Sequence, residues 1–509
     1  MQSTSGEGKQ FYKSKSWFGR LIGNTIYQKT LRIYFLTILI GSVFLYLPFS
    51  HRSPDPSKFN FFDAFFTAIS AFTNTGLSSH TTSSTFNFFG QLVLLILIQA
   101  GGIGFLTIVI FLWAILRKKR KITVEHRLFL HWERGSYNKV ESLPSVKTGI
   151  IVLLIAELIG AIILFFYFLI VEPDNPNKSN TNDGKYETVN TRGDFFGSLW
   201  MGVFHAVSSA NNAGFDILGS HSIIPYRTDA KNLLSVVLWL ESIVGGIGYP
   251  VFHDVWYFYK KKKRGEVAHF SLFTKIGIST YIFIAVLGAW LGVISEVSFA
   301  GTQGIFKARS ISDGDFGWGK NETANKIWNI IYLTFSSRSS GFSPIDTSEL
   351  AETTKWLLSI LMFIGASPAS TGGGIRTITI FIIFARMFYT AIGKKHLSVF
   401  YKTIDQSIVY EACNVFVLST ILVVGSIFFL VLAGNHNSVG DSFFESTSAF
   451  GTAGLTIGIT KKSNFLGRIV LMFLMFVGQL GVSNAVLSIT DLKPKSKNQE
   501  YCSENLRIV

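Results

Sequence analysis

Four short polar stretches in an otherwise apolar sequence could together coordinate a cation. Each holds small polar residues followed by Gly and then Leu or Phe, and each follows a short aromatic segment. Glycine at a fixed place allows backbone conformations that are closed to other residues. A ring of four such stretches can direct carbonyl oxygens at one axis, which is how a cation filter is built. The candidate ion-binding residues are Thr73, Asn74, Thr75 and Gly76; Asn211, Asn212, Ala213 and Gly214; Arg338, Ser339, Ser340 and Gly341; and Gly451, Thr452, Ala453 and Gly454.

The composition indicates an integral membrane protein. Of 509 residues, 48% are hydrophobic and only 15% are charged, which a soluble protein of this length would rarely show. Eight apolar segments are long enough, at ~1.5 Å per helical residue, to cross a hydrocarbon core of ~30 Å. They are Ile33–Phe49, Phe88–Leu116, Gly149–Val171, Leu233–Tyr259, Ile276–Ile294, Trp356–Phe388, Val415–Ala433 and Phe465–Leu487.

The formal net charge of +15 is explained by topology rather than by nucleic-acid binding. Basic residues cluster in the N-terminal tail, at Arg117–Lys121, at Lys260–Arg264, at Lys394–Lys395 and at Lys493–Lys497. The positive-inside rule places these regions, and therefore both termini, in the cytoplasm of a cell whose plasma membrane holds the chain. A second interpretation of the clusters near Arg117 and Lys260 is a docking surface for an acidic cytosolic partner. No nucleic-acid partner is expected.

Each polar stretch follows an apolar helix too short to span, which predicts a re-entrant helix. These short helices are expected at Phe61–Phe72, Phe195–Ser209, Ile327–Ser336 and Phe443–Phe450. The unit of helix, re-entrant pore helix and loop, and helix then occurs four times. The predicted fold is an all-α integral membrane protein with eight transmembrane helices in four repeats around a central pore. The repeats cover residues 30–121, 146–264, 272–396 and 405–490, between cytoplasmic tails 1–29 and 491–509.

One second span contains a break that could act as a gate. Its proline and four glycines disfavour continuous helix, and irregular backbone at membrane depth survives only where protein or water surrounds it. We expect this loop just below the filter; a simple proline kink is the alternative. The candidate gate residues are Gly365, Ala366, Ser367, Pro368, Ala369, Ser370, Thr371, Gly372, Gly373 and Gly374.

Glycine pairs recur in the other second spans. They are Gly101-Gly102-Ile103-Gly104, Gly245-Gly246-Ile247-Gly248 and Gly478-Gln479-Leu480-Gly481. Small residues let membrane helices approach closely, so these positions indicate helix packing, with pore lining as a further role.

Charged residues inside apolar segments are costly and therefore informative. Asp63, Asp194 and Asp441 begin the short helices and are interpreted as N-terminal caps. We expect Arg338 to turn away from the pore and to pair with Glu445 or Glu241.

Other polar side chains are given supporting roles. His205 is expected to be a packed residue, with a proton relay as the less favoured role. The side chains of Thr73, Asn211, Asn212, Ser339 and Thr452 are interpreted as supports of the filter rather than as ligands.

The sequence shows no enzyme signature. Its histidines are scattered, no Cys or His spacing suits zinc, and no glycine loop matches a phosphate-binding Gly-Lys-Ser/Thr motif. The two cysteines, Cys413 and Cys502, form no disulfide framework. We therefore expect no cofactor in this chain, and the only metal expected is the transported ion at the filter carbonyls.

Taken together, these residues resemble the Trk/Ktr/HKT superfamily of cation transporters. The resemblance covers about residues 30 to 490 and rests on four glycine loops, on the third loop Arg338–Phe342, and on the break at 365–374. With eight spans, the chain is most similar to the KtrB-type membrane subunit. This implies potassium uptake, a homodimer with one pore per protomer, and a cytosolic ring of RCK-type subunits that binds the regulatory nucleotide. Glycine at all four filter positions is the family's potassium pattern.

One residue departs from the family pattern. Where the fourth repeat of the family commonly has Gly-Arg-x-Gly, with the arginine as a barrier at the gate, this chain has Gln479. A neutral side chain there should lower the barrier to cations, so Gln479 joins the candidate gate residues. A sodium-permeable or sodium-coupled transporter and a membrane scaffold with a vestigial pore are the alternative functions.

Overall fold

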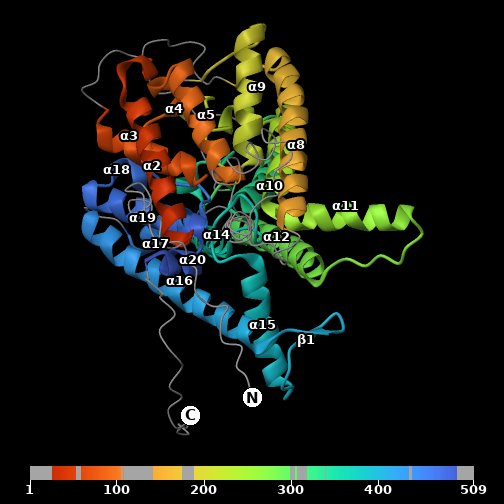
Figure 1. Cartoon of the computed structure of the whole chain (residues 1–509). Helices are drawn as coiled ribbons and strands as arrows, with labels where there is room; N and C mark the ends of the chain where they lie inside the picture. The colour runs from red at the N-terminus through yellow and green to blue at the C-terminus, as the bar shows by residue number, and fades with distance from the viewer. Residues whose placement is uncertain are drawn as a thin grey trace, which may run out of the picture.

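The computed structural model describes residues 26–52, 59–104, 107, 142–174, 188–298, 304–306, 318–338, 340–434 and 438–489. In these ranges the regular structure is helical apart from one two-stranded hairpin, β1 (Ser398–Val399) and β2 (Lys402–Thr403), in which Ser398 pairs with Thr403 and Val399 with Lys402. The predicted helical class is therefore confirmed. Figure 1 shows the hairpin projecting sideways near the lower end of α15, away from the body of the protein.

The helices follow the predicted order of long helix, short helix, loop and second helix. The main helices are α2 (Ile26–Tyr46), α3 (Phe61–Phe72) and α5 (Phe88–Ile103); α8 (Ser142–Ile170), α9 (Phe195–Ala210), α10 (Leu233–Ile247) and α11 (Tyr249–Lys263); α12 (Leu272–Ser298), α13 (Glu322–Ser336), α14 (Glu352–Ile364) and α15 (Thr377–Ala391); and α16 (Gln406–Ala433), α17 (Val439–Gly451), α19 (Phe465–Leu480) and α20 (Val482–Ile489). Single turns connect them: η1 (Pro48–Ser50), α4 (Thr82–Thr85), η3 (Ile224–Tyr226), η4 (Asp229–Asn232), η5 (Thr347–Glu349) and α18 (Ile459–Lys462).

The first helix of each unit is long and apolar. Among the described residues, α2, α8, α12 and α16 are long and apolar enough to cross a membrane, and the bent pair α10 and α11 is a fifth candidate. These four helices contain most of the predicted segments Ile33–Phe49, Gly149–Val171, Ile276–Ile294 and Val415–Ala433. Apolar length alone locates them because a helix in lipid satisfies its own backbone groups.

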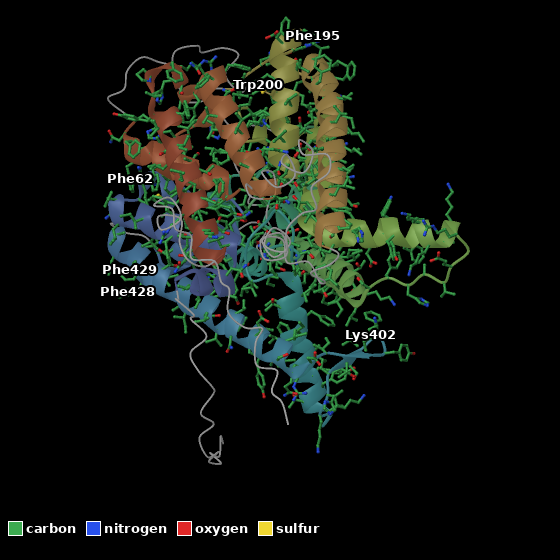
Figure 2. The ribbon with its side chains drawn as sticks, viewed as in Figure 1. Phe62, Phe195, Trp200, Lys402, Phe428 and Phe429 are labelled. Atoms are coloured by element: carbon green, nitrogen blue, oxygen red, sulfur yellow. The ribbon has the colours of Figure 1, made fainter. Side chains whose placement is uncertain are left out.

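The surface of these helices is apolar and their interior is partly polar. On α16, Phe428 is 63% exposed and Phe429 is 47% exposed, and Figure 2 shows both side chains on the outer side of the protein. Buried polar side chains instead gather where the short helices end, for example Ser208, Ser209 and Asn211. This distribution fits lipid outside and a polar pathway inside.

The short helices have the predicted positions, but of the three predicted caps only Asp63 makes a capping bond through its side chain. Asp63 lies in the first turn of α3, and its Oδ2 accepts the Asn60 N–H at 3.1 Å as part of a capping box. Asp441 lies in the first turn of α17, where its N–H bonds to Ser438 Oγ at 3.0 Å. Asp194 does occupy the cap position of α9, but its side chain makes no capping bond. A first-turn carboxylate still interacts favourably with the helix dipole.

Three second spans that were predicted to be continuous are broken, which corrects the prediction. Helix α5 ends at Ile103, α10 at Ile247 and α19 at Leu480, and each is followed by a glycine with positive φ: Gly104 (89°), Gly248 (97°) and Gly481 (83°). Glycine adopts such angles without the steric cost that other residues meet. The axis turns by 87° between α10 and α11. Residues 105–116 of the predicted span Phe88–Leu116, except 107, lie outside the described residues.

The recurrent glycines have the predicted packing role. A Cβ on Gly101 would collide with the carbonyl oxygen of Phe72, one on Gly245 with that of Ala210, and one on Gly478 with that of Phe450. Each of these carbonyls lies at the C-terminal end of a short helix. Glycine therefore allows each second helix to contact the end of the short helix in its own repeat.

Candidate functional site

The four candidate filter glycines lie together in the folded chain. A Cβ built on each would meet the carbonyl oxygen of the residue that precedes the corresponding glycine in another repeat. The pairs run in cyclic order: Gly76 with Ala213, Gly214 with Ser340, Gly341 with Ala453, and Gly454 with Thr75. In the first three pairs this separation would be 2.6, 2.9 and 2.9 Å. The loops of all four repeats thus form one closed ring.

The backbone of three loops has the same local geometry. The N–H before the glycine bonds back into the short helix: Thr75 to Ser70 O (2.9 Å), Ala213 to Ser208 O (2.8 Å) and Ala453 to Ser448 O (2.9 Å). The residue before it is left-handed in each case: Asn74 (51°), Asn212 (57°) and Thr452 (48°). The third loop differs, since the Ser340 N–H bonds to Ser336 O at 2.8 Å. Ser339 lies outside the described residues.

Side chains beside the second loop brace it. Asn211 Nδ2 donates to Gln99 Oε1 and to Glu157 Oε1, each at 2.9 Å, and Gln99 Nε2 donates to the Glu157 carboxylate. In the last turn of α9, just before this loop, Ser209 Oγ donates to the buried carboxylate of Glu241. Gln99 and Glu157 thus support the second loop, although both lie far from it in the sequence. No local sequence pattern indicates this contact.

His205 is packed, as expected. Its Nδ1 lies 2.8 Å from Met201 O, and the Ile217 N–H reaches Nε2 at 3.4 Å. The side chain is fully buried, so it links the second short helix to the chain that follows the second loop.

The expected pairing of Arg338 with a carboxylate is wrong. Arg338 is 1% exposed and donates to Tyr281 O and to Gly365 O, each at 2.8 Å. Its guanidinium carbon lies 4.2 Å from the centre of the Tyr281 ring. Main-chain carbonyls and an aromatic face satisfy this cation instead of a carboxylate.

The two proposed carboxylate partners have other donors. Glu445 accepts from Thr456 Oγ1 at 2.7 Å and from the Thr460 N–H at 2.9 Å, and Glu241 accepts from Ser209. Arg338 itself therefore connects the third loop to Gly365, where the loop 365–374 begins.

The loop 365–374 is non-helical and lies against the ring, so the simple proline kink is wrong. Asn212 Nδ2 of the second loop donates to Thr371 Oγ1 at 2.8 Å, and the Gly373 N–H donates to Thr452 Oγ1 at 2.7 Å. The Gln479 side chain donates to Thr371 O at 3.1 Å. Filter-loop side chains of two repeats and Gln479 of the fourth thus contact the same irregular segment.

A cavity lies on each side of this assembly. The first, about 370 Å³, is lined by the four glycines of the ring and by Asp216, His221, Asp346 and Lys461; we call it the glycine-side cavity. The second, about 330 Å³, is lined by Pro368–Ser370, Gly374, Arg376 and Gln479–Asn484; we call it the loop-side cavity. In the described part of the chain, no group of three or more His, Cys, Asp or Glu side chains could hold a metal ion.

Arg376 is a residue that the sequence interpretation missed. It adopts a φ of 83° and lines the loop-side cavity. Its guanidinium contacts Gly372 O, and it lies 3.4 Å from both Ser370 Oγ and Gln479 O. The available signal was an arginine two residues after a run of three glycines at membrane depth.

Comparison with known proteins decides the family. The family model TrkH, described as a cation transport protein, matches residues 28–501. The chain belongs to the TrkH family. An uncharacterized cation transporter of Mycoplasma genitalium is 33% identical over 97% of this chain and 100% of its own length. The Ktr system potassium uptake protein D of Bacillus subtilis is 30% identical over 96% of this chain and 99% of its own length.

A solved structure has the same fold. The potassium transporter TrkH from Vibrio parahaemolyticus superposes with a TM-score of 0.62 at 15% identity, over 92% of this chain and 86% of that one. The chain is thus a membrane cation transporter of the Trk/Ktr family, and the KtrB-type subunit fits it. Transporters, not enzymes, make up this family.

Proposed function

We propose that the chain is a potassium-uptake pore whose selectivity filter is the ring of four glycine loops. The observation that carries this proposal is the cyclic contact of Gly76, Gly214, Gly341 and Gly454, with a cavity on either side. Potassium must lose its water shell to pass a narrow pore, and backbone carbonyls can replace that shell. The carbonyls proposed as ligands belong to residues 73–76, 211–214, 338–341 and 451–454.

The short helices support this role through their direction. Helices α3, α9, α13 and α17 each end within one residue of the start of a filter loop. Their carbonyl ends carry partial negative charge, which favours a cation near the loops. Side chains of the loops are already bonded to protein groups, as Asn211, Asn212 and Thr452 show, so the backbone is the proposed ion ligand.

The loop 365–374 is the proposed gate. It lies between the ring and the loop-side cavity, and hydrogen bonds attach it to the second loop, to the fourth loop and to Gln479. Transport would require this segment to move aside. The Arg376 guanidinium next to Gln479 O places a positive charge at the same level of the path, where it opposes cation passage.

The remaining parts of the proposal concern topology and assembly. Eight spans in four repeats, with both termini in the cytoplasm of a plasma-membrane protein, would put the loop side inside the cell. Lys260–Lys263 end α11 and Lys394–Lys395 follow α15. By the positive-inside rule, basic clusters at these positions support this orientation. A homodimer and a nucleotide-binding RCK-type ring on the cytoplasmic side are proposed from the family resemblance.

Ion flux into proteoliposomes tests the proposal. The purified chain should give saturable rubidium flux that sodium does not replace, and Gly214→Asp should abolish it by placing a carboxylate in the ring. Gly193→Asp is the matched control, because Gly193 also has positive φ (80°) but has no atom within 4 Å of its Cβ position. Equal sodium flux would contradict the selectivity, and no flux even with an added RCK ring would favour the scaffold.

A further inference from the structure

Helix α11 leaves the helix bundle almost at a right angle. Helix α10 ends at Ile247, Gly248 follows with a φ of 97°, and α11 starts with Tyr249 and Pro250. Because the proline ring cannot sit in the middle of a continuous helix, it favours a new start here. The two axes differ by 87°, and Figure 1 shows α11 projecting sideways from the base of α8.

The base of α11 lies at one edge of the apolar span of α8. The Tyr249 ring packs against Gly149, where a Cβ would collide with it. From Gly149 to the end of α8 at Ile170, the helix rises about 32 Å at ~1.5 Å per residue, which matches a hydrocarbon core of ~30 Å. Lys147 precedes Gly149 by two positions. Helix α11 therefore begins at the membrane boundary and, being perpendicular to the bundle, runs along it.

The side chains of α11 suit this location. Trp256, Tyr257 and Tyr259 are 51%, 45% and 64% exposed, and aromatic side chains of this kind gather at the headgroup level of a bilayer. Four lysines, Lys260–Lys263, follow them at once. The Lys260 ammonium lies 4.7 Å from the Trp256 ring and that of Lys261 lies 4.8 Å from the Tyr257 ring.

The charge of this end of the helix is mainly positive, although Glu266 lies nearby, with its N–H bonded to Lys261 O at 3.1 Å. Arg264 extends the run of lysines to five cations. Helix α11 contains one acidic residue, Asp254, and its Oδ2 accepts a hydrogen bond from the Ser271 N–H at 2.8 Å. Clustered basic residues next to aromatic ones attract anionic lipid headgroups. An acidic protein partner would explain the lysines, but it would not explain why aromatic rings are exposed at the membrane boundary.

The junction of α10 and α11 is bonded to the loop 365–374, through Gly245 and Gly246 of α10 and Tyr249 of α11. The Tyr249 N–H donates to Ala369 O at 3.1 Å, the Ser367 N–H donates to Gly246 O at 3.1 Å, and the Thr371 N–H donates to Gly245 O at 3.1 Å. A Cβ on Gly248 would collide with Pro368 O. Movement of α11 relative to the bundle would therefore act directly on this loop.

We infer that α11 is a lipid-binding arm that rests on anionic phospholipid headgroups at the loop side of the membrane and thereby biases the position of the loop 365–374. The lipid contact stands on the geometry and charge of α11. The effect on transport rests in addition on the proposed function, since it needs that loop to be the gate.

The first test measures where α11 lies, without using transport. A fluorescent label on Tyr259→Cys, in a full-length chain with Cys413→Ser and Cys502→Ser, is reconstituted into vesicles whose lipids carry quenchers near the headgroup. Strong quenching with phosphatidylglycerol present, reduced when Lys260–Lys263 are changed to Gln, is expected. A label on Tyr401→Cys, fully exposed in the hairpin, is the aqueous control. A Tyr259 label quenched no more than that control overturns the inference, and protection only by an added acidic protein would assign α11 to a protein partner.

The second test measures rubidium flux in the same vesicles. Rubidium flux through the wild-type chain should differ several-fold between vesicles with and without phosphatidylglycerol. The double variant Lys261→Gln/Lys262→Gln should remove most of that difference. Lys394→Gln/Lys395→Gln removes the same charge from another exposed basic pair and should keep it. A lipid effect that both variants retain overturns the coupling. Quenching at Tyr259 with no flux in any variant contradicts the proposed function instead, while the lipid contact stands.

Discussion

Asn212 and Thr371 connect the ring of glycine loops to the loop beneath it. The Asn212 side-chain amide donates to Thr371 Oγ1 at 2.8 Å, although the two residues belong to different repeats. Both side chains are buried, so loss of this bond would leave a polar group without water to replace its partner. The contact therefore holds the proposed gate against the proposed filter.

Thr371→Val removes the hydroxyl at nearly constant volume. A buried donor left without its acceptor costs ~1–3 kcal/mol, which should loosen the loop and raise rubidium flux while the preference over sodium is retained. Thr420→Val is the matched control, because Thr420 Oγ1 bonds only within its own helix, to Phe416 O. Flux equal to wild type, with unchanged thermal stability, would show that this bond does not restrain the loop.

Gly214→Ala tests the close approach within the ring. Its Cβ would lie 2.8 Å from the Gly341 Cα and 2.9 Å from Ser340 O, at a φ of 67°. We expect rubidium flux to fall more than about tenfold, since backbone atoms cannot move aside without opening the ring. Gly193→Ala shares the positive φ without the contacts and should keep full flux. Similar losses in both variants would point to backbone strain alone.

Gln479→Arg places a second cation beside Arg376 in the loop-side cavity. Arg376 already lies 3.4 Å from Gln479 O, so the added charge should raise the barrier to every cation. An increase of only ~1.4 kcal/mol lowers the rate about tenfold. Rubidium flux should fall without a change in the potassium-over-sodium preference, because the ring itself is untouched. Gln479→Met is the control, because it removes the bond to Thr371 O without adding a charge. A shift in selectivity in the Gln479→Arg variant would count against the gate assignment.

Arg338→Lys should disturb both the filter and the gate. Lysine lacks the planar fork that reaches Tyr281 O and Gly365 O together, and each lost bond from a charged group costs ~1.5–3 kcal/mol. We expect a lower melting temperature in detergent and a loss of flux. Arg192→Lys is the control, since its pair with Glu172 is 58% and 37% exposed and such pairs contribute little. Equal melting temperatures for both variants would refute the bridging role.

Asp216 should make uptake sensitive to pH on the glycine side. Burial raises the pKa of its carboxyl to about 6, against the bonds from Ser222 and Leu218 and the charge of Lys461. The group is negative above that pH and neutral below it, so acidification through about pH 6 removes a charge that attracts cations to the cavity. The rubidium KM should then rise a few-fold.

Two variants identify the source of that dependence. Asp216→Asn should have a rubidium KM above that of the wild type at neutral pH, and this KM should change little when the pH falls below about 6. His221 also lines the cavity, so His221→Gln measures whether that side chain contributes to the pH dependence. A pH dependence that Asp216→Asn leaves intact would exclude Asp216 as its cause.

The sequence by itself determined the repeated plan of this protein. The bounds of α3 are the predicted Phe61–Phe72, and the four long helices lie at the predicted segments, because apolar length and flanking polar residues are local properties. The break at 365–374 was equally readable from its proline and glycines. The four glycine stretches were identified by a recurring local pattern of small polar residues, then Gly, then Leu or Phe.

Only the tertiary structure decided how these parts meet. The partners of Arg338 are carbonyls of residues 281 and 365, and no local pattern indicates which backbone groups approach a buried cation. The break between α10 and α11 lies where Gly248, with positive φ, approaches the loop 365–374, since a Cβ there would collide with Pro368 O. Sequence periodicity encodes an element's length and its apolar face. The partner of a buried polar group is instead set by long-range packing, since the group bonds to whichever donor or acceptor the fold brings within reach.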